Sequence, residues 1–169
     1  MAESVPVVEV ADGDDVAVLF RAHYARLVRT LTVICGDTDL AADAVQEAFV
    51  RAHGRWRSIR HYDDPVGWVR HVALNLLRDD RRRSTRKQRA IERLAVVTAA
   101  TAPPPAEPDG ATALLASLPR QQRVAAALFY VDGLSVAEVA AAMGIAPGSV
   151  KSHLHDARRS LRGIVGEEA

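Results

Sequence analysis

The sequence lacks several features that define common protein classes. Its 169 residues include a single cysteine, Cys35, which excludes an internal disulfide and a cysteine-rich zinc site. No apolar run is long enough to cross a bilayer, and the N-terminus lacks the basic start and apolar core of a signal peptide. We therefore expect a cytoplasmic protein without membrane insertion, in which Cys35 fills space in a helical core.

The residue clusters that catalysis requires are also missing. We find no set of metal ligands at suitable spacing and no nucleophile paired with a base. His153 and His155 are two residues apart, so on a helix their side chains diverge and make a poor metal pair. The sequence thus predicts a protein that is not an enzyme and that binds neither a metal nor a cofactor.

The net charge of +1 at pH 7 is unevenly distributed along the chain. Residues 1–50 contain three arginines and nine acidic residues, whereas residues 51–93 contain thirteen lysines or arginines and five acidic residues. Residues 112–169 are nearly balanced, with six basic and five acidic side chains. A local excess of positive charge attracts phosphates, although basic runs can also be solvated helix faces.

Helical periodicity extends along the chain, and we find no strand pattern. After an acidic tail at residues 1–13, apolar residues predict a helix from Asp14 to Gly36 and another to about His53. The buried stripe of that second helix is either the row through Leu40, Ala44, Ala48 and Ala52 or the row through Ala41, Val45 and Phe49. Asp64 and Pro65 read as the N-cap and first residue of a third helix.

Four prolines between residues 95 and 111 predict a flexible linker. Beyond it, helices are expected from Ala113 to Leu118 and from Pro119 through Val131. The fold class is therefore all-α, with two small helical domains at residues 14–94 and 112–165 joined by the linker.

Residues 134–161 have the pattern of two short helices joined by a tight turn. Gly144 can adopt the left-handed conformation that ends the first helix, and Pro147 suits the first turn of the second. Apolar residues of the second helix recur at steps of four and three from Val150, which leaves polar and basic residues on its other face. A helix of this kind suits the DNA major groove, although an ordinary helical hairpin with a solvated face has the same pattern.

Two further surfaces stand out in the N-terminal half. Asp43, Gln46, Glu47 and Val50 share one face of a helix, which favours protein docking or plain solvation over metal binding. The stretch Arg55 to Asp64, predicted as a loop, is rich in arginine and aromatic residues and leads to a helix with a basic end. This combination suits single-stranded nucleic acid. Trp56 and Trp68 can equally be core residues.

Both halves together resemble a group IV, or extracytoplasmic-function, sigma factor of bacterial RNA polymerase. The resemblance is carried by LAADAVQEAFVRAH, PVGWVRHVALNLLRDDRRR and the C-terminal run from LPRQQRVAAALFYVDGLS to KSHLHDARRSLR. It covers about residues 14–93 and 112–165. It implies a subunit that directs core polymerase to promoters and that binds the coiled coil of the largest subunit and the flap. An anti-sigma factor is a further partner of many members.

The resemblance also implies roles for individual residues. Core polymerase would bind Asp43, Gln46, Glu47, Phe49 and Val50. The non-template strand of the minus-ten element would be captured by Ser58, Arg60, His61, Arg70 and Asn75, with Arg78, Arg81 and Arg82 on its backbone.

The minus-thirty-five duplex would be bound by the second helix of the pair. Bases would be read by Lys151, Ser152, His153, His155 and Asp156, and phosphates would be held by Gly148, Ser149, Arg158 and Arg159. The family commonly has arginine where His153 and Asp156 stand, and an aspartate repels phosphate but can accept a hydrogen bond from a cytosine amino group. The alternative function is a stand-alone helix-turn-helix repressor or activator, although the chain shows no dimerisation seam.

Overall fold

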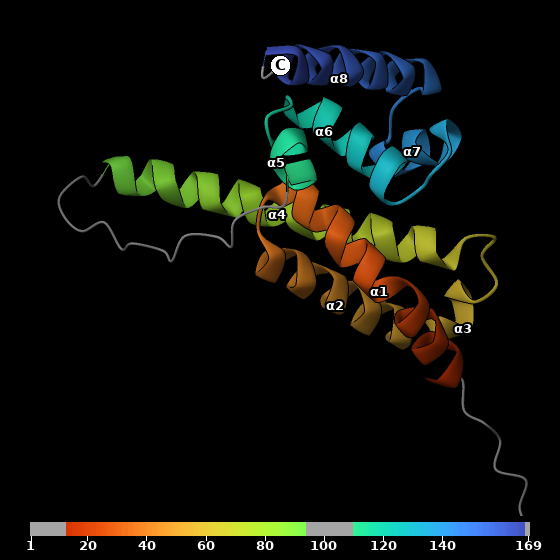
Figure 1. The fold of residues 1–169 in the computed structure, drawn as a ribbon. Helices are drawn as coiled ribbons and strands as arrows, with labels where there is room; N and C mark the ends of the chain where they lie inside the picture. The colour runs from red at the N-terminus through yellow and green to blue at the C-terminus, as the bar shows by residue number, and fades with distance from the viewer. Residues whose placement is uncertain (1–12, 94–109, 168–169) are drawn as a thin grey trace, which may run out of the picture.

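The computed structural model describes residues 13–93 and 110–167, and these ranges form helices without strands. We refer to the first range as the N-terminal unit and to the second as the C-terminal unit (Figure 1). The N-terminal unit contains α1 (Gly13–Cys35), α2 (Thr38–Gly54), α3 (Trp56–Ile59) and α4 (Pro65–Arg93). The C-terminal unit contains α5 (Gly110–Ala116), α6 (Arg120–Ala126), the π-helical turn η1 (Ala127–Val131), α7 (Val136–Met143) and α8 (Pro147–Glu167).

The all-α prediction is confirmed, with differences at some boundaries. Residues 1–12 of the predicted tail and residues 94–109, which include most of the predicted linker, lie outside the described residues. The helix expected from Ala113 already begins at Gly110. None of the described helices combines the length and apolar character needed to span a membrane.

Helix α2 packs against both α1 and α4 in the N-terminal unit. Both rows that the sequence offered as its buried stripe are in the core, because α2 has a neighbouring helix on each side. Alanine makes up most of the buried side chains of α2, and such small residues allow the neighbouring helices to approach closely. Cys35 at the end of α1 is half-buried against this core, and its thiol donates to the backbone oxygen of Asp37 at 3.1 Å.

The starts of α2 and α4 are fixed by N-caps, of which the cap of α4 was predicted from the sequence. Asp37 accepts a hydrogen bond from the backbone N–H of Leu40 at 3.0 Å, and Asp64 accepts one from Gly67 at 2.8 Å. A Cβ at Gly67 would lie 2.2 Å from the Asp64 carboxylate, so a larger residue at this position would require the Asp64 side chain to shift.

The prediction of a loop from Arg55 to Asp64 is wrong in part, since Trp56–Ile59 forms the short helix α3. Trp56 and Ile59 are three residues apart, so both side chains point into the core, where they are 7% and 1% exposed. Trp56 is therefore a core residue. Trp68 is half-buried and packs against the same core.

The two units pack against each other. Helix α1 contacts α5, α6 and η1, and α4 contacts α7 (Figure 1). Their buried apolar residues form one continuous cluster, which includes Leu27 and Leu31 of α1 together with Leu128 of η1 and Val139 of α7. Burial of this kind removes apolar surface of both units from water and stabilises their contact.

The helix expected from Pro119 through Val131 is interrupted by the π-helical turn η1. The backbone N–H of Asp132 donates to the carbonyl of Ala127 at 3.1 Å, five residues earlier. A π turn inserts one extra residue into the helical ladder. Directly after this turn, the side chain of Asp132 is buried between the two units.

Candidate nucleic-acid interface

The predicted helix-turn-helix is formed by α7 and α8. Ser135 caps α7 in a capping box, in which its hydroxyl accepts from the Glu138 N–H at 3.2 Å and Glu138 accepts from the Ser135 N–H at 2.7 Å. Gly144 ends α7 with a positive φ of 68°, and Pro147 is the first residue of α8. The turn between the two helices is therefore built as its residues predict.

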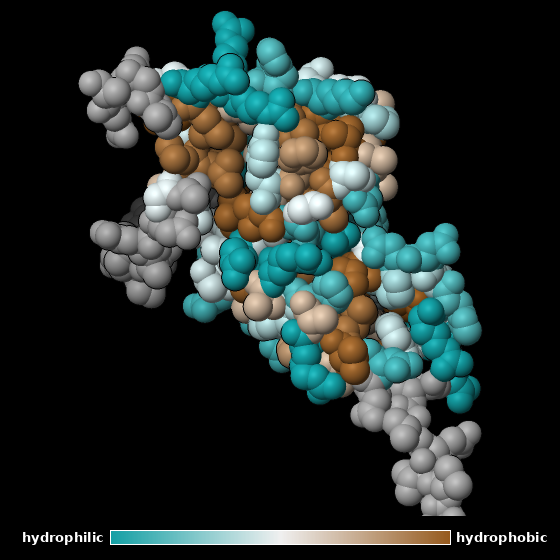
Figure 2. All heavy atoms as spheres, turned by 45° about the vertical axis from the view of Figure 1, so that its right-hand side comes forward, coloured by the Kyte–Doolittle hydropathy of each residue, from teal (hydrophilic) through white to brown (hydrophobic). Residues whose placement is uncertain are grey.

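Helix α8 buries one side and exposes the other. Val150, Leu154 and Ala157 are at most 2% exposed and pack on α6 and α7. The exposed residues of the predicted set are Gly148, Ser149, Lys151, Ser152, His155, Asp156, Arg158 and Arg159. Helix α8 lies at the edge of the molecule farthest from α2, where hydrophilic side chains predominate (Figures 1 and 2).

Some side chains on α8 already have partners. Arg158 donates to the hydroxyl of Tyr130 at 2.6 Å, and the Ser152 hydroxyl donates to the backbone oxygen of Gly148 at 3.2 Å. His153 is only half-exposed. Lys151, His155, Asp156 and Arg159 are therefore the side chains of this face that can reach a ligand with least rearrangement.

The acidic face of α2 is exposed, except for one residue. Asp43, Gln46, Glu47 and Val50 are all exposed, and Val50 reaches 60%. Phe49 is only 4% exposed and packs edge-on against Phe20, with ring centroids 5.0 Å apart. Phe49 therefore lies beneath this exposed face, because its position in the helix turns it toward α1, and its contact with core polymerase stays a prediction.

The predicted strand-binding residues fall into two groups. Ser58, Arg60 and His61 are exposed on α3 and the turn after it, and Tyr62 beside them is 49% exposed. On α4 the amide nitrogen of Asn75 lies 2.9 Å from a ring nitrogen of His71, and Arg78 donates to the Asn75 oxygen at 3.2 Å. His71, which the sequence analysis did not single out, thus joins the predicted site through spacing of one helical turn.

Arg70 is not on the surface where it was expected. It is 4% exposed, and its Nε lies 2.5 Å from an oxygen of Asp132. Arg26 of α1 lies 3.1 Å from the other oxygen of Asp132, as a charge pair whose angles do not make a hydrogen bond. We call Asp132, Arg26 and Arg70 the Asp132 cluster. The prediction of an accessible Arg70 is wrong for this arrangement, because Asp132 occupies its guanidinium.

The Asp132 cluster joins the N-terminal and C-terminal units. The Asp132 side chain has no exposed surface, and a buried carboxylate is tolerated only when positive partners compensate for its lost hydration. His23 lies beside the cluster, and its Nδ1 is 2.9 Å from a guanidinium nitrogen of Arg26. Burial, and then the charges of Arg26 and Arg70, lower the pKa of His23.

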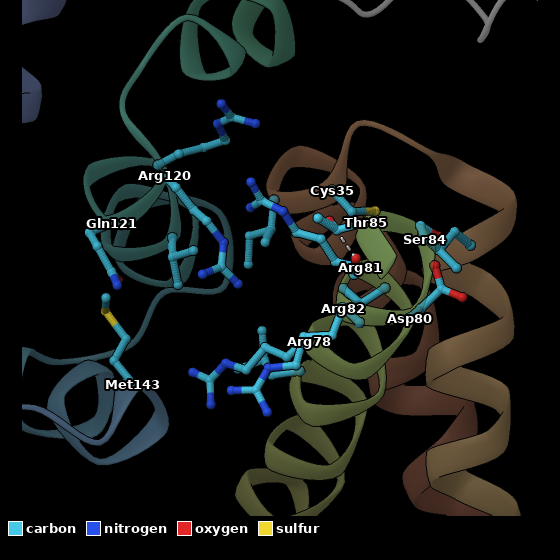
Figure 3. A pocket seen from close by; sticks show the side chains of 16 residues that line it. Cys35, Arg78, Asp80, Arg81, Arg82, Ser84, Thr85, Arg120, Gln121 and Met143 are labelled. Atoms are coloured by element: carbon cyan, nitrogen blue, oxygen red, sulfur yellow. Dashed lines mark hydrogen bonds between the residues drawn. The ribbon is translucent and has the colours of Figure 1, made fainter. Parts of the chain in front are cut away.

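Arg81 and Arg82 are exposed at the rim of a cavity between α4 and α6 (Figure 3). Arg120 and Arg123 of α6 line the same cavity, and the sequence analysis did not predict them as site residues. The position of Arg120 and Arg123 at this cavity could not be predicted from local sequence patterns, and neither could the pairing of Arg26 with Asp132. Asp132 precedes a glycine at a helix end and reads simply as a terminator, and its partners are 62 and 106 positions away.

No group of three or more metal-ligating side chains lies together in the part of the chain that the structure describes.

Comparisons with known proteins match both units. The family model described as sigma-70 region 2 matches residues 19–87, and the model described as sigma-70 region 4 matches residues 111–161. The chain is 33% identical to the ECF RNA polymerase sigma factor SigL of Mycobacterium tuberculosis over 154 residues, which cover 85% of each protein. It is 31% identical to SigM of the same organism, over 88% of this chain and 76% of SigM. It is 30% identical to SigE of Mycolicibacterium smegmatis over 94% of this chain but only 66% of SigE.

Solved structures show the same fold at lower identity. The sigma factor RpoE from Bartonella quintana, crystallised with the anti-sigma factor NepR, matches with a TM-score of 0.75 and 21% identity over 90% of this chain and 98% of RpoE. CnrH, solved in complex with the cytosolic domain of CnrY, matches with a TM-score of 0.62 and 22% identity over 93% of this chain and 91% of CnrH.

Proposed function

The chain belongs to the extracytoplasmic-function sigma factors of the sigma-70 family, and from this premise we propose how its surfaces divide the work of promoter recognition. It directs core RNA polymerase to specific promoters and contributes no catalytic group of its own. The observation that carries the proposal is the exposed face of α8, a helix that lies on the opposite side of the molecule from α2 (Figure 1). One chain can thereby hold DNA and polymerase on different sides. No observation favours a stand-alone repressor or activator.

The exposed face of α2 is the docking surface for the coiled coil of the largest polymerase subunit. Asp43, Gln46, Glu47 and Val50 provide two carboxylates, an amide and an apolar contact on one helix face. Glu47 also pairs with Arg51 at 2.7 Å, but both side chains are about half-exposed and such a pair is weak in water. The C-terminal unit is expected to contact the flap.

The minus-ten strand is captured by α3, the turn after it and α4. Ser58, Arg60 and His61 lie beside the exposed ring of Tyr62, which can stack on an unpaired base. Asn75 can hydrogen-bond the edge of such a base, while Arg78, Arg81 and Arg82 follow the phosphates. Arg70 joins this surface only when Asp132 withdraws from it. Strand capture therefore requires the C-terminal unit to move away from α4.

The minus-thirty-five duplex is read by α8 in the major groove. Lys151, Ser152, His153, His155 and Asp156 are the base-reading candidates. Gly148 and Ser149 at the helix start, with Arg158 and Arg159, hold phosphates. All of these except half-buried His153 are exposed while the two units are in contact, so this surface does not depend on their separation.

Asp43→Arg tests the docking surface. The reversed charge is expected to weaken binding to core polymerase at least a hundredfold, because it places like charges against the partner surface. Fluorescence competition for core polymerase measures the affinity. Asp15→Arg makes the same change at an exposed site of α1 and should leave binding within twofold. If the Asp43 variant competes as well as the parent, the docking assignment is wrong. A separate assay, specific transcription from mapped promoters, tests the proposed function itself.

A further inference from the structure

A basic cavity of about 910 Å³ lies between the two units. Arg78, Arg81 and Arg82 reach into it from α4, and Arg120 and Arg123 line it from α6 (Figure 3). Its volume is within the range of small-molecule sites in proteins. We call it the arginine cavity. It is distinct from the Asp132 cluster, none of whose members lines it.

Positive charge in the arginine cavity is poorly compensated. Five arginines line it, and Asp80 is the one carboxylate among its described lining residues. Between residues that the structure describes, no ion pair joins any of the five guanidinium groups to a carboxylate. Arg78 and Arg123 are half-buried, and like charges that are partly withdrawn from water repel one another more strongly than in bulk water. An anion in this cavity would relieve that repulsion.

Two arginines of α6 show the effect of this crowding. Burial, and then the neighbouring guanidinium groups of Arg81, Arg78, Arg123 and Arg82, lower the pKa of Arg120. Arg123 donates to the backbone oxygen of Leu118 at 3.0 Å, but its Nε is buried without a hydrogen-bond partner in the described part of the chain. A buried donor without a partner costs free energy, so this nitrogen favours an acceptor.

The arginine cavity also has an apolar wall. Leu74 and Leu77 of α4 and Val124 of α6 are less than 9% exposed, and they line it together with Met143 of α7. A ligand with a charged end and an apolar or flat body would use both parts. Arginine forks bind phosphate oxygens in pairs, which makes phosphate the anion that best fits the charged part.

We propose that the arginine cavity binds a small anion carrying two or more linked phosphates, of which a nucleoside polyphosphate fits both the arginines and the apolar wall. Linked phosphates place several charges in one small molecule, which matches the five arginines that line this one cavity. A nucleic-acid strand instead spreads its charges along a backbone.

Because arginines of both units line the cavity, the bound anion stabilises the arrangement in which α6 lies against α4. This consequence rests on the proposed function, since the anion then competes with the minus-ten strand for Arg78, Arg81 and Arg82. The binding itself does not rest on it. Arg120 and Arg123 have no assigned part in DNA binding. Their substitution therefore tests anion binding separately from the proposed capture of the minus-ten strand.

Isothermal titration calorimetry of the full chain with sodium tripolyphosphate and, separately, with ATP tests the proposal in the absence of divalent cations. We expect one site per chain for both anions, with ATP binding more tightly because of the apolar wall. Arg120→Gln should weaken both at least tenfold. Arg29→Gln removes an exposed arginine of α1 outside the cavity and should leave both affinities within twofold.

Several results would overturn the proposal. The proposal is wrong if the parent and Arg120→Gln bind the anions equally tightly, or if several weak sites are measured in place of one. It is also wrong if neither anion gives a heat of binding. Tighter binding of tripolyphosphate than of ATP identifies inorganic polyphosphate as the ligand and overturns the nucleotide. If single-stranded DNA binds with the same dependence on Arg120 and displaces both anions, the cavity is a strand channel. Should Arg120→Gln unfold at a lower temperature than the parent, Arg81→Gln at the exposed rim replaces it.

Discussion

The two surfaces proposed for promoter DNA differ in how far the folded chain leaves them accessible. The duplex-reading face of α8 is exposed over most of its length. On α4, by contrast, Arg70 is buried against Asp132, and the arginines that follow it face α6 across the cavity. On the proposed assignment, the free chain can therefore bind a duplex in its present arrangement, whereas full strand capture by α4 needs the C-terminal unit to move.

The Asp132 cluster determines how accessible Arg70 is, and a substitution at Asp132 tests this. Asp132→Asn removes the negative charge that pairs with both Arg26 and Arg70. Breaking a buried ion pair costs about 3–5 kcal/mol. We expect a large loss in the free energy of unfolding measured by urea denaturation. Binding of a single-stranded minus-ten oligonucleotide should tighten about tenfold or more, because Arg70 becomes available.

Asp156→Asn is the matched control for this change, since Asp156 is exposed on α8. It should leave both the unfolding free energy and strand binding unchanged. An Asp132→Asn protein that is as stable as the parent and binds the oligonucleotide no better would show that Arg70 is not withheld by this contact.

Local signals in the sequence were sufficient for the helices and for the exposed surfaces. Asp64 before Pro65 and the left-handed Gly144 act on neighbouring residues, so both were predicted from the sequence. The capping box of Ser135 and Glu138 is equally local, but it was first seen in the structure. The recognition face of α8 followed in the same way, since the burial of Val150 and Leu154 leaves the intervening residues outside.

Contacts between distant residues were not predictable in this way. Phe49 belonged to one of the two rows of α2 that the sequence offered as buried, and only the family resemblance assigned it to the docking surface. That both rows are covered depends on how the neighbouring helices pack on α2. The π turn before Asp132 and the pairing of Asp132 with Arg26 and Arg70 depend on how the two units meet. Periodicity along one helix carries no information about the partner of a charge on another.

Arg159→Ala tests the phosphate contact proposed for the exposed face of α8. Loss of one phosphate contact should weaken binding of the holoenzyme to a minus-thirty-five duplex about threefold to tenfold and reduce the slope of log affinity against log salt by about 0.9. The effect should be the same in the parent and in Asp132→Asn, because α8 is exposed in either case. Arg29→Ala on α1 is the control. An unchanged salt slope would remove Arg159 from the phosphate contacts.

Ser135→Ala tests whether the recognition face depends on the cap of α7. The substitution removes one half of the capping box and should cost about 1 kcal/mol of unfolding free energy. Thermal or urea unfolding measures it, and Ser160→Ala at an exposed site of α8 serves as the control. A loss no larger than that of the control would mean that packing, and not the cap, fixes the helix pair.

The smallest expected effect concerns pH at His23, beside the Asp132 cluster. The Nδ1 of His23 can accept from Arg26 only while the imidazole is neutral, and protonation would add a positive charge beside Arg26 and Arg70. Since burial lowers the pKa of His23 below 6.5, the unfolded chain binds this proton more readily than the folded one. Its contribution to stability is therefore complete above pH 6.5 and is lost as the pH falls.

His23→Gln should accordingly show a smaller drop in the urea midpoint between pH 7.5 and pH 5.5 than the parent shows. Asp132 and Asp64 act in the opposite direction on the same imidazole, and His23 is only half-buried, so the difference will be modest. His155→Gln, on the exposed face of α8, should leave the pH dependence as it is in the parent. Equal pH dependence in all three proteins would mean that the contact between the units is held by Asp132 and its two arginines without any contribution from His23.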